Sequence, residues 1–259
     1  MKTLAKIATI AAVLAVCAIG AATETPIENL SKERTILLDN EGKYLTPMNV
    51  NELSRYDFSP LFGELEYCEA SERIYGCYLA YIGDNYQRLH IVFDEIKKIA
   101  PLKYAAKGQT MVKGNYCDFS GEITIDKAYR YKEFTKEYDG ELIDQGVAFA
   151  EVILRENDKQ KGSGVFTGDL MTKWYIDANR TLQYDDIEDF ADGYANNQFL
   201  GVWTSYKTSA QKRVAWGHGR IPLSLGFDTG TGEFAVNPKY IKNGWEQHGS
   251  LNEVNWSKK

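Results

Sequence analysis

Residues 115–125 read Asn-Tyr-Cys-Asp-Phe-Ser-Gly-Glu-Ile-Thr-Ile, and this stretch decides the fold class. Successive side chains of a β-strand point to opposite faces, so a strand with one buried face alternates apolar and polar residues. One face of this stretch is apolar and carries Cys117, Phe119, Ile123 and Ile125. The stretch is therefore predicted to be a half-buried strand.

The same period of two recurs along most of the chain. It is found in Arg73–Ile82, Leu89–Phe93, Ala128–Tyr138, Glu141–Leu154, Gly164–Asp177, Asn197–Thr208 and Arg213–Trp216. Short turn signals separate these segments, and Asp139-Gly140 is a strong two-residue hairpin signal. Helical periodicity is weak, and Asp186–Tyr194 is its one candidate. About seven to ten strands joined by short turns predict an all-β domain, an antiparallel β-barrel or sandwich.

Three segments share an aromatic residue, a glycine, an acid and an aliphatic residue. They are Phe62–Leu65, Phe119–Ile123 and Phe166–Leu170. A glycine inside a strand permits close backbone approach or a bend, as small barrels need. We interpret the three segments as repeated strand geometry in a meander.

The first 22 residues have the order of a secretory signal peptide. Lys2 and Lys6 precede an apolar run over Ile7–Val16, and small residues follow at Gly20–Ala22. The run is too short for an ordinary transmembrane helix, and no second long apolar stretch follows it. We therefore expect a secreted or periplasmic protein without a transmembrane segment.

Cys17 provides an alternative to free release. It lies at the end of the apolar run, where bacterial lipoproteins carry an acylated cysteine, and acylation would anchor the mature protein to a membrane. Val16 is bulkier than the small residue usual before such a cysteine. We favour cleavage near Ala22.

Removing residues 1–22 leaves 237 of the 259 residues, enough for a substantial core. Residues 23–60 lack a sustained period and are predicted to form an irregular N-terminal arm. Residues 61–259 are predicted to form the barrel or sandwich domain, with a loop-rich C-terminal segment.

The charge is unevenly distributed. Removing the signal takes away two lysines and no acid, which changes the formal net charge from −6 to −8. Residues 206–259 are nevertheless basic, with 8 Lys and Arg against 4 Asp and Glu. An acidic chain disfavours non-specific nucleic-acid binding, so no nucleic-acid partner is expected.

Three cysteines remain after cleavage: Cys68, Cys77 and Cys117. An exported protein can oxidise one pair, which would leave one thiol. Cys68 and Cys77 would close a small loop, whereas Cys77 and Cys117 would connect separate strands. The spacing gives no support to a structural zinc site.

Oxygen donors from Asp177 to Glu188 have the spacing of a calcium-binding loop. Leu182 stands where that loop needs a glycine, so we favour a polar turn followed by an acidic surface loop. Looser calcium binding by Asp185, Asp186 and Glu188 is the alternative, and no other cofactor is expected.

No nucleophile elbow, zinc-protease, phosphate-binding-loop or dinucleotide-binding motif occurs in the sequence. His218 is the one histidine with glycine on both sides, in Gly217-His218-Gly219, where the backbone can approach a ligand closely. As a general base, it would need a partner that the sequence does not identify.

Aromatic residues are abundant, with 17 Tyr, 11 Phe and 5 Trp. Barrels of about eight strands hold one small ligand or are filled by side chains, and aromatic residues suit both. The predicted ligand surface lies near the basic C-terminal segment and consists of Trp203, Tyr206, Trp216, His218 and Arg220.

The block Asn197–Thr208, followed by Trp216-Gly217, Arg220–Pro222 and Gly232–Phe234, resembles a pattern in uncharacterised secreted bacterial proteins. Its Gly-x-Trp element, Gly201 to Trp203, is also similar to one in lipocalin-type barrels. The resemblance covers about a fifth of the chain and implies a calycin-like meander without implying an activity.

These features favour an exported, non-enzymatic binding module that holds a small ligand or a protein partner. Two alternatives stay open. One is a secreted hydrolase that uses carboxylates or His218, and the other is a structural or protein-interaction domain.

Overall fold

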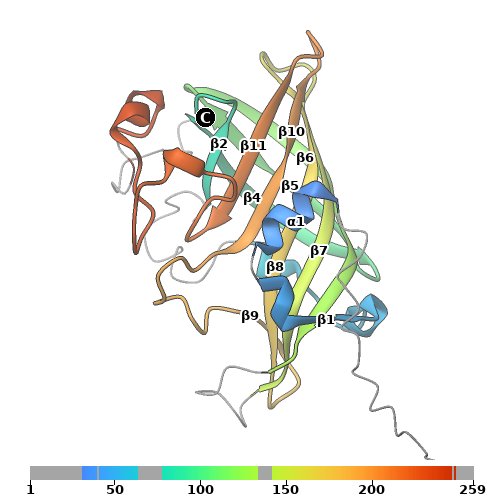
Figure 1. Cartoon of the computed structure of the whole chain (residues 1–259). Helices are drawn as coiled ribbons and strands as arrows, with labels where there is room; N and C mark the ends of the chain where they lie inside the picture. The colour runs from blue at the N-terminus through green and yellow to red at the C-terminus, as the bar shows by residue number, and fades with distance from the viewer. Residues whose placement is uncertain (1–30, 40, 64–77, 134–141, 247, 249–259) are drawn as a thin grey trace, which may run out of the picture.

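The computed structural model describes residues 31–39, 41–63, 78–133, 142–246 and 248 (Figure 1). The N-terminal elements are α1 (Lys32–Leu38), η1 (Glu41–Tyr44), β1 (Leu45–Met48), η2 (Val50–Leu53) and α2 (Ser59–Phe62). The strands that follow are β2 (Leu79–Ile82), β3 (Gln87–Arg88), β4 (His90–Ala100), β5 (Lys103–Val112), β6 (Asn115–Tyr131), β7 (Leu142–Glu156), β8 (Gly164–Asp177), β9 (Leu182–Tyr184), β10 (Asn196–Ser205) and β11 (Gln211–His218). The last elements are the short 3-10 helices η4 (Leu225–Phe227) and η5 (Pro238–Asn243).

The strands form one antiparallel sheet that curls strongly into a half-barrel, which confirms the predicted all-β class (Figure 1). The strand order is β3-β2-β11-β10-β8-β7-β6-β5-β4, with β1 added to β6 and β9 added to β8. The two ends of this path are joined in the chain by Leu89, whose backbone N–H donates to the carbonyl of Ala80 at 3.1 Å. The curled sheet therefore brings its first and last strands together at this corner.

Glycines inside the strands allow neighbouring strands to approach closely. Gly168 of β8 lies opposite Gly201 of β10, and a Cβ atom on Gly201 would lie 2.3 Å from the carbonyl oxygen of Thr167. A Cβ atom on Gly121 of β6 would lie 1.9 Å from the carbonyl oxygen of Ile153. Two of the three repeated segments thus place a glycine at a close strand contact, whereas Gly63 of the third follows α2.

Side chains fill the concave side of the sheet, which we call the inner core. Phe166, Phe199 and Trp216 belong to it, and each is at most 1% exposed. The N-terminal arm and α2, which crosses the predicted boundary at residue 60, also enter it, because Phe58 of the arm and Leu61 and Phe62 of α2 belong to the same cluster. In the described part of the chain, the arm therefore helps to fill the half-barrel.

The convex side of the sheet is covered by α1 and by the C-terminal segment (Figure 1). The guanidinium of Arg34 in α1 binds Asp126 through two hydrogen bonds of 2.8 Å and binds Asp169 at 2.7 Å. Arg34 is buried, and its guanidinium also lies 5.4 Å from the ring centroid of Phe149. This contact fastens α1 to β6 and β8.

Several local predictions need adjustment. The predicted strands 115–125 and 128–138 share one described strand, β6, which passes through a register shift between Ile125 and Lys127. Residues 186–194 form turns rather than a helix. The arm is more regular than predicted, because it contains α1, β1 and α2.

Other predictions lie outside the described residues. These include the signal peptide, Cys17, the Asp139-Gly140 turn and the cysteines Cys68 and Cys77. Cys117 is buried in β6. Because Cys68 and Cys77 lie outside the described residues, the disulfide stays a prediction. No helix in the described ranges is long and apolar enough to cross a membrane.

Candidate functional site

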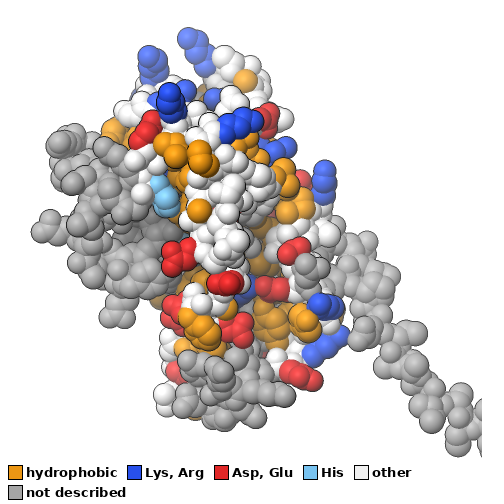
Figure 2. Space-filling view, turned by 60° about the vertical axis from the view of Figure 1, so that its left-hand side comes forward, with side chains coloured by type: hydrophobic (Ala, Val, Ile, Leu, Met, Phe, Trp, Pro, Cys, Tyr) orange, Lys and Arg blue, Asp and Glu red, His pale blue; other side chains and the backbone are white. Residues whose placement is uncertain are grey.

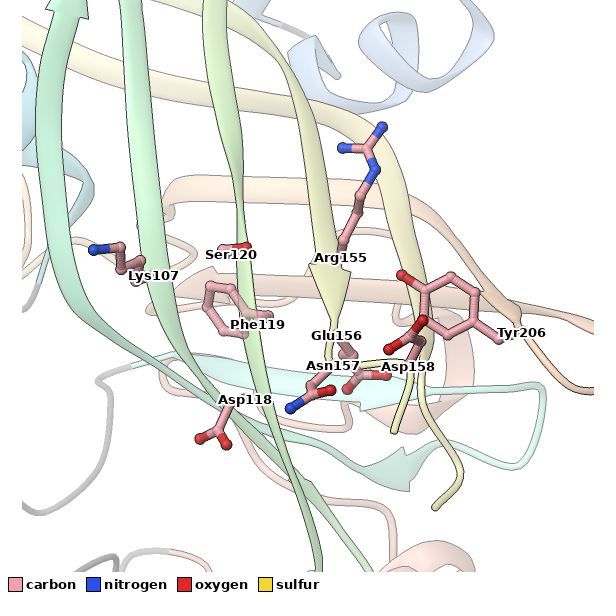
Figure 3. A pocket seen from close by; sticks show the side chains of 9 residues that line it. All are labelled: Lys107, Asp118, Phe119, Ser120, Arg155, Glu156, Asn157, Asp158 and Tyr206. Atoms are coloured by element: carbon pink, nitrogen blue, oxygen red, sulfur yellow. The ribbon is translucent and has the colours of Figure 1, made fainter. Parts of the chain in front are cut away.

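A pocket of about 610 Å³ lies beside β5, β6 and β7, near the ends of these strands that lead into the turns 113–114 and 157–163 (Figure 3). Most of its lining side chains are polar or charged. The lining residues are Lys107, Asp118, Phe119, Ser120, Arg155, Glu156, Asn157, Asp158 and Tyr206.

Strand register places three polar residues in a row across the convex face. Lys107 of β5 lies opposite Ser120 of β6, which in turn lies opposite Arg155 of β7. Neighbouring strands are about 4.8 Å apart, so the hydroxyl of Ser120 stands between two cationic side chains. Lys107 also forms a 3.1 Å ion pair with the exposed carboxylate of Glu95.

Arg155 and Asp158 bring opposite charges to one side of the pocket. Both side chains are exposed, and neither has a hydrogen-bond or ion-pair partner within the described residues. In Figure 3 the hydroxyl of Tyr206 points to the space between these two residues.

Tyr206 reports the electrostatics of this part of the pocket. Partial burial raises the pKa of its phenol, Asp158 and Glu156 raise this pKa further, and Arg155 opposes them. Tyr206 is 43% exposed, so it is accessible to a ligand. The charges of Arg155 and Asp158 both affect the pKa of its phenol.

Glu156 forms the buried end of the pocket. Its carboxylate accepts hydrogen bonds from the hydroxyl of Thr110, the backbone N–H of Gly164 at 2.8 Å and the indole N–H of Trp203 at 2.9 Å. Burial raises the pKa of Glu156, and these three hydrogen bonds oppose the shift. Both carboxylate oxygens are therefore already bound by the protein.

Asp118 is held in the same way at the other side of the pocket. Its two carboxylate oxygens accept hydrogen bonds from Gln109 at 2.8 Å and from Gln160 at 3.0 Å. Of the three carboxylates in the lining, Asp158 is thus the one whose oxygens are not bound by other described side chains or amides.

Of the five predicted ligand residues, Tyr206 lines the pocket and Trp203 lies directly behind it, bonded to Glu156. Trp216 is buried in the inner core and stacks on Phe199 at a centroid distance of 3.7 Å. The structure therefore does not gather these aromatic residues into one surface.

His218 is enclosed in the inner part of the molecule. Its Nδ1 lies 2.8 Å from the hydroxyl of Tyr184, and its ring stacks on Tyr78 at 4.2 Å. Burial lowers the pKa of His218 to about 3, so the imidazole is neutral at physiological pH. Its hydrogen-bond partner is a phenol rather than an acid, which gives no support to a general-base role.

Arg220 is bound by the C-terminal segment. Its guanidinium forms an ion pair with Asp228 and donates to the carbonyl of Gly230 at 3.2 Å and to that of Gly232. These bonds hold the loop 228–232 in place. Arg220 therefore stabilises the C-terminal segment and does not line the pocket.

The acidic residues proposed for calcium do not converge. Asp185 is buried and accepts a 2.8 Å hydrogen bond from Gln145, whereas Asp186 and Glu188 are exposed. The described ranges contain no group of three or more His, Cys, Asp or Glu residues arranged to hold a metal ion. Calcium binding thus gains no support from the geometry.

The sequence does not mark the pocket residues Ser120, Arg155 and Asp158, because polar and charged residues near a turn usually lie in solvent. Glu156 did leave a signal in the sequence. It continues the inward-facing series of β7, in which Val152 and Leu154 belong to the inner core. An acid in an apolar register indicates a buried polar contact.

Comparison of the chain with protein-family models, with curated proteins and with solved structures finds no match.

Proposed function

We propose that the protein is an exported, non-enzymatic binding module that holds a small zwitterionic ligand in the pocket of Figure 3. The observation that carries the proposal is the pair of opposite charges, Arg155 and Asp158, on the two sides of the Tyr206 hydroxyl. A ligand with a carboxylate and an ammonium group would satisfy both charges at once.

The chemistry of the side chains supports this ligand class. Arginine binds carboxylates through two parallel N–H donors, and an aspartate accepts hydrogen bonds from an ammonium group. Tyr206 and Ser120 add hydroxyls beside these charges that can donate or accept further hydrogen bonds.

The hydrolase alternative receives less support from the same pocket. Glycoside hydrolysis needs two carboxyl groups facing the bond that breaks. Asp118 and Glu156 instead have their oxygens bound by the protein. The protein-interaction alternative is favoured by no comparable feature of this pocket.

The test is calorimetric titration with free amino acids, each compared with its decarboxylated amine and its deaminated acid. We expect the zwitterion to bind more tightly than either analogue. Arg155→Gln should remove the preference for the zwitterion over the amine, and Asp158→Asn should remove the preference over the acid.

Lys159→Gln is the matched control, because Lys159 is an exposed neighbour that does not line the pocket. It should bind like the unmodified protein. Failure of every amino acid to bind, or equal binding by both pocket variants and the control, would overturn the proposal.

A further inference from the structure

A cluster of exposed lysines lies at one end of the half-barrel, on three different turns. Lys113 lies in the turn between β5 and β6, Lys159 and Lys161 lie between β7 and β8, and Lys207 lies between β10 and β11. We call this cluster the lysine end. In Figure 2 the Lys and Arg side chains gather at the upper end of the molecule, and acidic side chains are more frequent below.

Hydrogen bonds between the three turns hold the lysine end together. The side-chain amide of Asn115 donates to the carbonyl of Lys161 at 2.9 Å, and the backbone N–H of Tyr206 donates to the carbonyl of Ser163 at 3.2 Å. The four lysines therefore project from one connected platform.

The positive charge of this platform is little neutralised. None of the four lysines has an ion-pair partner in the part of the chain that the structure describes. Among the acids at this end, Asp84 faces Arg213 at 3.8 Å, and Glu156 is buried and hydrogen-bonded. The three pocket carboxylates, Asp118, Glu156 and Asp158, offset part of this positive charge, and Asp158 is the exposed one.

A separate acidic surface lies away from the lysine end, in the loop that follows β9, which pairs with the far end of β8. The loop between β9 and β10 carries four exposed acids: Asp186, Glu188, Asp189 and Asp192. Because the whole chain has a formal net charge of −6, an anionic surface would repel most of the molecule and attract the lysine end. The charge distribution therefore favours approach to an anionic surface with the lysine end first.

We infer that the lysine end docks on the surface of an anionic lipid bilayer. Three turn tips at the end of a barrel fit a broad flat surface better than a linear polymer, which would need a groove or a stripe of cations. Tyr206 is 43% exposed at this end, and tyrosine is favoured at the headgroup level of membranes. The predicted export would bring the protein into a compartment bounded by lipid.

The test is co-sedimentation of the full mature chain with vesicles of phosphatidylglycerol and phosphatidylcholine, compared with phosphatidylcholine alone. We expect binding to the anionic vesicles that weakens as the salt concentration rises. The triple variant Lys159→Glu, Lys161→Glu, Lys207→Glu should weaken this binding by at least about tenfold, since each basic residue near an anionic membrane contributes.

The control is a second triple variant with the same change in net charge, Lys32→Glu, Lys43→Glu, Lys97→Glu, at exposed positions on α1, η1 and β4. It should bind within about twofold of the unmodified protein if the lysine end carries the contact. Circular dichroism of both variants checks that they are folded.

Three results would overturn the inference: no binding to anionic vesicles, equal loss in both variants, or binding to soluble polyphosphate without binding to vesicles. The last result would assign the lysine end to a soluble polyanion. None of the substituted lysines lines the pocket, so this test is independent of the zwitterion proposal.

Discussion

Glu156 and His218 are both buried polar side chains, but they differ in how many hydrogen bonds they form with the rest of the protein. The carboxylate of Glu156 accepts three hydrogen bonds, which link β7 to Thr110 of β5, Gly164 of β8 and Trp203 of β10. The imidazole of His218 has Tyr184 as its hydrogen-bond partner, and its Nε2 has none among the described residues. Glu156 therefore joins strands, whereas His218 is held mainly by ring contacts.

The first prediction concerns acid stability. The pKa of His218 is lowered from 6.5 to about 3, so the unfolded chain binds a proton at pH values where the folded protein does not. The contribution of His218 to stability is therefore complete above pH 6.5 and is lost as the pH falls towards 3. We expect a slope of up to about 1.4 kcal/mol per pH unit from this residue.

His218→Phe keeps a ring against Tyr78 and removes the titration, so its urea unfolding should depend less on pH over this range. His248→Phe is the control, because His248 is half-buried rather than enclosed by the core. An unchanged pH slope in His218→Phe would contradict the prediction.

At the scale of elements, α1 is held on the sheet by one buried cation. Arg34 is 4% exposed, and its partners Asp126 and Asp169 come from β6 and β8. Asp126 follows Ile125 at the register shift of β6. The interruption of the strand pattern thus coincides with the ion pair that docks the helix.

The second prediction is that Arg34→Met lowers the free energy of unfolding by about 3 kcal/mol. The reason is that Asp169, whose side chain is 15% exposed, would lose its counter-charge. Lys32→Met on the exposed side of α1 should change stability by less than about 0.5 kcal/mol. Urea titrations compare the two variants.

A further variant separates charge from packing. Adding Asp126→Asn and Asp169→Asn to Arg34→Met removes the uncompensated acids, so part of the lost stability should return. If Arg34→Met costs no more than Lys32→Met, then α1 is held by its apolar contacts alone.

At the scale of the whole molecule, the N-terminal arm contacts both sides of the curled sheet. α1 packs on the convex side, β1 pairs with the far end of β6, and Phe58 lies in the inner core next to Phe62 of α2. Phe62 contacts Tyr104 edge to face at 5.4 Å, and the carbonyl of Phe62 accepts a 2.8 Å hydrogen bond from Tyr78. The arm is thus part of the fold.

The third prediction is that Phe62→Ala lowers the free energy of unfolding by about 3–5 kcal/mol, because it leaves a cavity in a closely packed interior. Phe62 is 1% exposed, whereas Ile99 of β4 is 51% exposed. Ile99→Ala should therefore cost less than about 1 kcal/mol. Thermal and urea unfolding measure both, and equal costs would show that α2 does not help to hold the half-barrel together.

Much of the fold was predictable from local pattern. Gly164–Asp177 is strand β8 with the predicted bounds, because Phe166, Leu170, Trp174 and Ile176 stay on one face and the pairing with β10 has no register shift. The single strand β6 was predicted as two segments, because a register shift changes which residues face inward and a period-two reading cannot follow it. The arm was underestimated because its helices are short and are stabilised by tertiary contacts.

The candidate site was less predictable. The sequence predicts Tyr206 as a ligand residue, and Tyr206 does line the pocket, but the same prediction includes Trp216, which lies in the inner core. Arg155 and Ser120 become neighbours through pairing of β6 with β7, and Asp158 joins them through the turn that follows. The sequence around a strand end does not show which residues of the neighbouring strands will lie beside it.

The sequence by itself therefore determined the class of the fold, because alternation is a property of each strand and needs no knowledge of the rest. It also determined the excess of positive charge after Tyr206, whereas export stays a prediction. Tertiary structure decided that aromatic residues and α2 fill the half-barrel, and that a polar pocket lies at the ends of three strands. Curvature and strand register are set by contacts between residues distant in sequence, so the same aromatic side chain can fill a core or line a site.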